Sequence, residues 1–508
     1  MKYIDNFLNK ITMYRIVLYS LLTLVAAAFV LSLFGILHFN PLLFVLGILF
    51  IIAVSVASNG IFAKVFNAPT NIESVYITAL ILALIISPMQ STSDMGFIAL
   101  AFWASTIATA SKYILAIGKK HIFNPAAIAV VITAFFMNLS ASWWVGTGAM
   151  LPFVLITGFL ITRKIVRGDL VVSFLLSAFI VILATKFGNP GSIPNYFITT
   201  ALDVPLFFFA TIMLTEPLTT PPTRILRIWY GVFVGVLFAP FAHIGSISFT
   251  PELALVVGNI FSYIVSPKVK PVLSLTEKIK LTPNIYDFVF ESDKTFSFKP
   301  GQYLEWTLGH EKADNRGNRR YFTIASSPTE KNIHLGVKFY DHSSSFKKAL
   351  FSLKEGDEIV ATGLAGDFTL PKNKKEKLVF IAGGIGVTPF RSMIKYLADK
   401  NEKRNIVFLY SNPTLADIAY KDVFEDARAR IGLRTIYAVT RESPQAANPS
   451  YYFGRIAGDM IAKAIPDFSE RHFYISGTHD MVTTCNAELA KIGVKKSNIK
   501  TDFFPGFA

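Results

Sequence analysis

The chain has 508 residues, of which 52% are apolar, and its formal net charge is +15. This length is enough for several domains, and the apolar content is above that of an ordinary soluble protein. The single cysteine, Cys485, excludes a disulfide framework and any iron–sulfur cluster held by cysteines of this chain. Since the apolar excess lies before about residue 267, the sequence predicts a membrane domain, residues 1–267, followed by a soluble part.

Long uncharged apolar runs recur through the first part and predict about ten membrane-spanning segments. Helices are the expected form, because runs this long cannot be strands of a closed barrel. The expected spans lie near 14–38, 42–63, 74–89, 95–117, 122–140, 146–162, 169–186, 201–216, 225–243 and 251–266.

Basic residues gather on one side of these spans, from Lys2 before the first to Lys270 after the tenth. The positive-inside rule then predicts a multi-pass protein of the cell inner (cytoplasmic) membrane with both termini in the cytoplasm. The positive charge therefore indicates topology and contact with the lipid bilayer, and no nucleic-acid partner is expected. Lys112 is the one basic residue inside a span, near its cytoplasmic end, where we expect its amine to snorkel.

Two pairs of segments in this part look related. Thr78–Pro88 resembles Thr211–Pro221, and Asn124–Val131 resembles Thr250–Val257. The offset is five spans, so the two copies would cross the membrane in opposite directions. This pattern is typical of an inverted repeat, which places a site near the interface between the copies.

Polar residues cluster at two points on the cytoplasmic side, His121–Ala127 and Leu214–Thr223. Asn124 and Pro125 are suited to start a helix whose free amides face a ligand. The prolines of the second stretch break regular helix, and broken backbone in a membrane persists only where it lines a cavity or packs on protein. Plain capping and kinking of helices would also explain both stretches.

Residues 272–508 read as a soluble protein. Short β-like runs with turns occupy 272–370, and their spacing predicts an antiparallel β-barrel. In 371–508 the pattern changes to an α/β domain with a parallel sheet, whose ligand is expected at the carboxyl ends of the strands. Its strands are expected at 378–382, 406–410, 434–439 and 472–476.

A glycine-rich loop follows the first strand of this sheet. Gly383, Gly384 and Gly386 let the backbone turn tightly and let a ligand approach it closely. Thr388 is suited to cap a helix and Pro389 to begin it. Free amides and the helix dipole favour phosphate at such a point, which predicts a dinucleotide site; an ordinary tight turn between strand and helix is the alternative.

Residues 272–508 resemble the ferredoxin–NADP reductase family, because several of its motifs occur here in order. Lys299–Tyr303 resembles the P-G-Q strand of the flavin barrel, and Arg320-Tyr321-Phe322-Thr323 resembles the R-x-Y-[ST] motif. The resemblance implies bound FAD, with Arg320 on its pyrophosphate, Phe322 stacked on its ring and the Thr323 hydroxyl beside the ring. Tyr321 belongs to the same cofactor-binding motif.

Further positions follow from the same resemblance. Ser344 and Ser345 fall where the family supplies more pyrophosphate contacts, and the glycine-rich loop matches its pyridine-nucleotide loop. Ser476 and Gly477 begin a stretch that resembles C-G-P-x-x-M, with Ser476 in the place of cysteine. Thr323, Phe322 and Ser476 are therefore the expected catalytic residues. Arg441 resembles the arginine that reads a 2′-phosphate, which favours NADPH slightly and leaves NADH open.

The membrane part resembles the flavin-holding membrane proteins of two complexes, the Rnf electron-transport complex and the sodium-pumping NADH:quinone reductase, over most of residues 70–267. The stretches that carry this resemblance are N-P-A-A at 124–127 and T-E-P-L-T-T-P-P-T at 215–223. The resemblance implies a flavin near Asn124, Thr215 and Thr219. The S-G-A-T motif for covalent FMN is absent, so non-covalent FMN or riboflavin is implied.

These expectations combine into a membrane-bound NAD(P)H dehydrogenase that passes electrons through FAD and a membrane flavin to quinone or an acceptor across the membrane. Additional electron-transfer subunits are candidate partners, and no metal site is expected. One alternative is a transporter gated by a redox-sensing flavin domain. Another is a b-haem ferric reductase, for which the membrane part offers only His38, His121 and His243, all near span ends.

Overall fold

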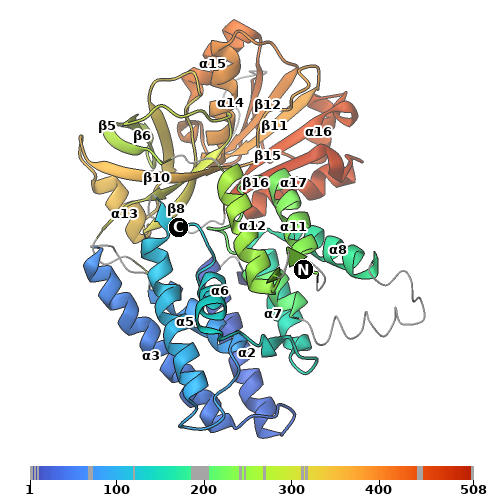
Figure 1. Cartoon of the computed structure of the whole chain (residues 1–508). Coiled ribbons are helices and arrows are strands. Elements are labelled where there is room, and N and C mark those ends of the chain that lie inside the picture. The colour runs from blue at the N-terminus through green and yellow to red at the C-terminus, as the bar shows by residue number, and fades with distance from the viewer. Residues whose placement is uncertain are drawn as a thin grey trace. The chain divides into compact units, whose positions relative to one another are not determined.

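The structure is a computed structural model that describes residues 4, 7–8, 11–66, 72–117, 120–184, 205–239, 243–244, 247–266, 270–310, 314, 318–442 and 450–504. The chain divides into two compact units, Met1–Ser266 and Pro267–Ala508. The first unit is built mainly of helices, and the second of two six-stranded sheets with helices (Figure 1). The predicted change of architecture near residue 267 coincides with the division between the units.

The helices of the first unit overlap the expected spans. Its longer helices are α2 (Met13–Leu33), α3 (Pro41–Val65), α5 (Met95–Ile114), α7 (Leu151–Ile165), α8 (Gly168–Ala184), α11 (Arg224–Phe238) and α12 (Pro251–Val265). The shorter ones are α4 (Ile72–Ile85), α6 (Pro125–Met137), α10 (Leu206–Phe208) and a π-helical turn, Phe209–Met213. Among the helices in the described residues, only α2, α3 and α5 are long and apolar enough to cross a membrane. The prediction of about ten spans is therefore wrong.

The spans were overcounted because apolar character continues past the point where a helix ends. Helix α6 begins at Pro125, where the Asn124 side chain caps it by accepting a hydrogen bond from the amide of Ala127 at 3.1 Å. It ends at Asn138, which has a left-handed φ of 57°. The 13 residues between these points span about 20 Å, which is short of the hydrocarbon core of a bilayer.

The same local arrangement occurs twice in this unit. A two-stranded hairpin precedes a helix that begins with proline after a polar cap, Asn124 in one copy and Thr250 in the other. The hairpins are β1 (Ala116–Ile117) with β2 (Lys120–His121), before α6, and β3 (His243–Ile244) with β4 (Ile247–Ser248), before α12.

Helices α6 and α12 pack in opposite directions. At the start of α6, the amide of Asn124 donates to Oδ1 of Asn259, in the later part of α12, at 2.8 Å. Beyond the end of α6, Nε1 of Trp143 donates to Oε2 of Glu252, in the first turn of α12, at 2.8 Å. The contacts at both ends therefore show that the two capped helices run antiparallel.

The second unit contains a six-stranded antiparallel sheet in the order β8-β7-β10-β5-β6-β9. Its strands are β5 (Val272–Thr282), β6 (Ile285–Ser292), β7 (Tyr303–Thr307), β8 (Arg319–Thr323), β9 (Ile333–Lys338) and β10 (Glu358–Ala365), and helix α13 (Ser345–Ser352) lies between β9 and β10 in the chain.

The predicted closed barrel is wrong, because the edge strands β8 and β9 form no ladder in the described residues. Past the end of β8, the amide of Ala325 donates to the carbonyl of His334 in β9 at 2.9 Å. The return bond is made to a side chain instead, since the amide of His334 donates to Oγ of Ser326 at 3.1 Å. The chain turns away at this point and the sheet stays open.

The other sheet has six parallel strands in the order β14-β13-β12-β11-β15-β16, which confirms the predicted α/β domain. The strands are β11 (Leu378–Gly383), β12 (Ile406–Asn412), β13 (Arg434–Val439), β14 (Tyr451–Phe453), β15 (His472–Thr478) and β16 (Ile499–Phe504). The helices are α14 (Thr388–Asp399), α15 (Lys421–Ile431), α16 (Gly458–Ala464) and α17 (His479–Lys491). The strand order reverses between β11 and β15, and a sheet of this kind binds its ligand at the carboxyl ends of those strands.

Candidate functional site

The glycine-rich loop leaves the carboxyl end of β11 and leads into α14. Gly384 has a φ of +52°, a conformation that glycine adopts without strain. A Cβ on Gly386 would lie 2.6 Å from the carbonyl oxygen of Ser476 and 2.7 Å from the amide nitrogen of Gly477. Only a bare backbone therefore fits where this loop touches the end of β15.

The loop after β15 interlocks with the first one. Ser476 is the register partner of Ala382 on β11, so both loops leave the sheet at the same level. A Cβ would lie 1.9 Å from Sδ of Met481 if placed on Gly383, and 2.9 Å if placed on Gly477. The structure thus brings together the predicted nucleotide residues Gly383, Gly386, Ser476 and Gly477.

The start of α14 differs in one detail from expectation. Pro389 lies buried in the first turn, where its missing amide hydrogen costs nothing. Thr388 does not cap the helix, because it is already helical and its hydroxyl donates to the carbonyl of Ile385 at 3.3 Å. The tight turn between Gly384 and Val387 takes up the position at which a capping side chain was expected.

The flavin motif lies on edge strand β8. Two of its side chains converge on the buried ring of Phe346 in α13. The guanidinium carbon of Arg320 lies 5.3 Å from the centre of the Phe346 ring, and the centre of the Phe322 ring lies 5.9 Å from it. Tyr321 alternates to the opposite face, 39% exposed, with its ring 5.7 Å from that of Tyr303. The strand therefore groups Arg320 with Phe322 and separates Tyr321 from them.

The beginning of α13 meets Arg320 through one carboxylate. Asp314 places Oδ1 3.4 Å from Nη2 of Arg320, and its Oδ2 accepts a hydrogen bond from the amide of Ser345 at 3.0 Å. Ser344 caps the helix through its hydroxyl, which accepts from the amide of Lys347 at 3.4 Å. An arginine and helix N-terminal amides that hold an anion here have the donor chemistry that a pyrophosphate requires.

Two predicted catalytic hydroxyls are buried without a hydrogen-bond partner. Thr323 is 3% and Ser476 0% exposed, and Oγ1 of the first and Oγ of the second find no partner in the part of the chain that the structure describes. A buried hydroxyl without a partner costs about 1–3 kcal/mol. Such hydroxyls fit a site completed by a ligand, so the residues present fit FAD and a nicotinamide nucleotide.

Arg441 lies just past the end of β13 with its side chain exposed. Its amide donates to the carbonyl of Pro413, just past β12, at 2.9 Å. The residue thus stands over the carboxyl ends of these two strands, and its role in reading a 2′-phosphate stays a prediction.

The sequence pattern does not single out Asp502, which the structure places beside the end of β15. It is the register partner of Ser476 on the next strand, β16. Burial raises the pKa of its carboxyl from the usual range to about 7. No motif marks this aspartate, and its position becomes visible only when β16 pairs with β15.

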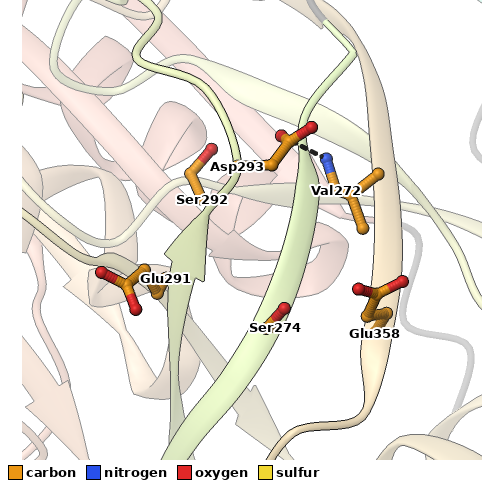
Figure 2. A pocket seen from close by; sticks show the side chains of 6 residues that line it. All are labelled: Val272, Ser274, Glu291, Ser292, Asp293 and Glu358. Atoms are coloured by element: carbon orange, nitrogen blue, oxygen red, sulfur yellow. Dashed lines mark hydrogen bonds between the residues drawn. The ribbon is translucent and has the colours of Figure 1, made fainter.

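A separate surface hollow of about 420 Å³ lies on the antiparallel sheet, and Figure 2 shows the side chains around it. Three of its six lining residues, Glu291, Asp293 and Glu358, are acidic. Carboxylates repel phosphate, and none of the predicted site residues lines this hollow. We therefore do not assign the nucleotides to it.

In the helical unit the two predicted polar points meet. Nδ2 of Asn124 donates to the carbonyl of Met213 at 3.4 Å, and Oγ1 of Thr215 donates to the carbonyl of Thr211 at 2.7 Å. Oγ1 of Thr219 donates to Oε2 of Glu216 at 3.3 Å. Each of these three side chains is hydrogen-bonded to a group of the protein itself, and their role at a flavin stays a prediction.

The two sheets, the interlocked loops and the cluster around Arg320 give the second unit the arrangement expected of a ferredoxin–NADP reductase-like FAD/NAD-binding domain. Comparison with known proteins agrees: residues 380–487 match the family model described as the oxidoreductase NAD-binding domain.

Three similar proteins illustrate the match. A flavohemoprotein from Bacillus cereus (strain ATCC 10987 / NRS 248) is 26% identical over 251 residues, 45% of this chain and 60% of that protein. The glycine betaine monooxygenase reductase subunit from Chromohalobacter salexigens is 27% identical over 230 residues, 44% of this chain and 62% of that one. The FAD/NAD-binding domain of a nitric oxide dioxygenase from Vibrio cholerae matches 46% of this chain and 98% of that one with 20% identity and a TM-score of 0.41. The chain spans about three-fifths of the length of the curated relatives it matches.

Proposed function

We propose that the protein is a membrane-bound oxidoreductase that takes hydride from NAD(P)H and passes the electrons to an acceptor reached through the helical unit. The observation that carries this proposal is the convergence of two glycine-containing loops at the reversal point of the parallel sheet. Ser476 stands at the start of the second loop, and its buried hydroxyl has no hydrogen-bond partner among the described residues. Bound FAD would supply the conversion of one hydride into single electrons.

The chain's own residues have distinct parts in this scheme. Arg320 and the first amides of α13 would hold the FAD pyrophosphate, and Phe322 would pack against its ring. The loops at Gly383–Thr388 and Ser476–Met481 would hold the nucleotide, so that Thr323 and Ser476 donate or accept hydrogen bonds at the reacting rings. Asp314 would leave Arg320 when the pyrophosphate takes its place.

The helical unit supports the membrane part of the proposal. Helices α2, α3 and α5 are long and apolar enough to cross a bilayer, and the first two expose bulky apolar side chains such as Leu33 and Leu42. The antiparallel pair α6 and α12 supports the relation to inverted-repeat membrane proteins. We propose cytoplasmic termini, quinone as the acceptor, and a non-covalent FMN or riboflavin in this unit.

One experiment tests the scheme. The full chain is purified in lipid nanodiscs and its flavins are counted before and after denaturation, and NADH and NADPH oxidation is followed with ferricyanide and with a short-chain quinone. We expect the chain to carry FAD that denaturation releases. We also expect it to oxidise NAD(P)H with both acceptors. A chain that binds no flavin, or turnover that never reaches quinone, would refute the corresponding half of the proposal.

A further inference from the structure

The helical unit carries a cluster of ionisable side chains away from the nucleotide site. Nε2 of His121 lies 2.9 Å from Oε1 of Glu216. The other carboxylate oxygen accepts the hydrogen bond from Thr219. The pair joins the segment before α6 to the segment after the π-helical turn, 95 residues apart. Ionisable side chains are costly in a membrane domain, so such a cluster is expected to have a function.

Neighbouring helices add polar groups around this pair. From α5, Nζ of Lys112 donates to the carbonyl of Ser74 at 2.9 Å and to the hydroxyl of Ser74 at 3.1 Å. The Lys112 amine also interacts electrostatically with Glu216. The amine is thus hydrogen-bonded to a residue in the first turn of α4, and the expectation that it snorkels stays a prediction. From α11, the hydroxyl of Tyr230 accepts a hydrogen bond from Nδ2 of Asn259 at 3.0 Å, and it too lies within range of Glu216.

The geometry of the pair suits proton exchange. The side chain of His121 is 11% exposed and that of Glu216 is 23% exposed, so both are sheltered and yet reachable. Imidazole is the side chain that gains and loses a proton most readily near neutral pH. The carboxylate holds the ring in one orientation through the 2.9 Å contact between Nε2 and Oε1.

We propose that His121 and Glu216 are the proton-donating pair for a quinone reduced in the helical unit, an inference that rests on the proposed function. Reduction of a quinone to its quinol takes two electrons and two protons. NAD(P)H gives up one hydride, which supplies both electrons and one proton, and the second proton comes from the aqueous phase. In each proton transfer an N–H bond of His121 breaks and an O–H bond forms on a quinone oxygen. Water on the exposed side of the pair then returns a proton to the imidazole ring.

The test compares two acceptors with the flavin-loaded full chain in nanodiscs. Ferricyanide takes electrons without protons, whereas a short-chain quinone needs both. In His121→Gln and Glu216→Gln we expect ferricyanide reduction to stay within about twofold of wild type, and quinone reduction to fall about a hundredfold. The solvent deuterium isotope effect on quinone reduction should rise in both variants.

The matched control breaks a different ion pair of the same unit. Glu73→Gln removes the partner of Arg15, whose Nε lies 3.3 Å from Oε1 of Glu73, and should leave both reactions unchanged. A further variant, His121→Gly, should regain quinone reduction when imidazole is added, which a purely structural role would not produce.

Each other outcome counts against the proposal. Variants that reduce quinone at the wild-type rate, with an unchanged isotope effect, overturn the role of the pair. Equal losses with both acceptors, without rescue by imidazole, overturn it as well, because they show a structural defect. A wild-type chain that reduces ferricyanide but no quinone refutes the proposed function itself, and the inference with it.

Discussion

Arg391 and Glu330 form a two-pronged ion pair that fastens helix α14 to the loop after the flavin motif. Nη2 of Arg391 lies 2.9 Å from Oε1 of Glu330, and Nη1 bonds the other carboxylate oxygen. Nη1 also donates to the carbonyl of Ala325 at 3.1 Å, and the next residue, Ser392, donates from its hydroxyl to the carbonyl of Ser326 at 2.6 Å. The helix that begins at the glycine-rich loop is therefore fixed to the segment that follows the flavin motif, and the proposed hydride transfer would depend on such fixed distances.

Glu330→Gln should destabilise the second unit strongly. The Arg391 side chain is only 6% exposed, and a buried charge that loses its partner costs about 3–5 kcal/mol. We expect a lower temperature of FAD release from the full chain, measured by flavin fluorescence. Lys331→Gln is the matched control, because the Lys331–Glu291 pair is 85% and 57% exposed and should contribute less than about 1 kcal/mol. Equal shifts in the two variants would contradict the prediction.

Thr323→Val and Ser476→Ala should slow chemistry without harming the fold. Neither hydroxyl bonds to the described protein, so its removal should leave the free energy of unfolding unchanged or slightly higher. The rate at which NAD(P)H bleaches the flavin absorbance should fall about tenfold to a hundredfold. In the control Thr276→Val, the lost bond to the carbonyl of Val289, 3.0 Å long, should cost about 1 kcal/mol and leave the rate unchanged. A loss of stability in the first two variants would show that their hydroxyls serve the fold.

The loops of the nucleotide site were predictable because local chemistry decides them. Gly383, Gly384 and Gly386 indicate a bare-backbone turn, and alternation of strands and helices places it at the edge of a parallel sheet. Other features depend on partners that the sequence does not pair. Asp502 lies beside Ser476 only because β16 pairs with β15 in this register. The barrel remained open because a serine hydroxyl, on Ser326, took the place of a ladder bond, and no local pattern encodes that choice.

Gly386→Ala should weaken nucleotide binding. The added methyl group would stand 2.6 Å from a backbone oxygen, which has no flexible end to move aside, so the two loops must separate. We expect the Kd for NAD(P)H, from the concentration dependence of flavin bleaching, to rise at least about tenfold. Gly309→Ala is the control, since a Cβ there meets nothing within 4 Å and the backbone is ordinary. An unchanged Kd in Gly386→Ala would mean that the loop does not bind the nucleotide.

The stability of the second unit should fall between about pH 4 and pH 7 because of Asp502. Burial raises the pKa of this carboxyl to about 7 from its ordinary value of 3.8, so in that window the folded protein keeps a proton that the unfolded chain has lost. Stability therefore decreases as pH rises through the window and becomes level above it. Asp502→Asn should flatten this part of the profile, measured as the temperature of FAD release at several pH values. If Asp502→Asn shows the same decrease of the FAD-release temperature with pH as the wild type, another group causes the effect.

Arg441→Ala should change the choice between NADPH and NADH. The arginine stands exposed at the carboxyl ends of β12 and β13, tied there by the 2.9 Å bond from its amide to the carbonyl of Pro413. A charge-assisted contact with a 2′-phosphate would be lost, so the KM for NADPH should rise about tenfold while that for NADH stays the same. Arg428→Ala on α15 is the control, because its guanidinium faces Glu425 at 3.7 Å and Ser450 at 3.5 Å. If both nucleotides respond alike to Arg441→Ala, the arginine acts on the loop and not on the 2′-phosphate; if neither responds, the enzyme reads its nucleotide elsewhere.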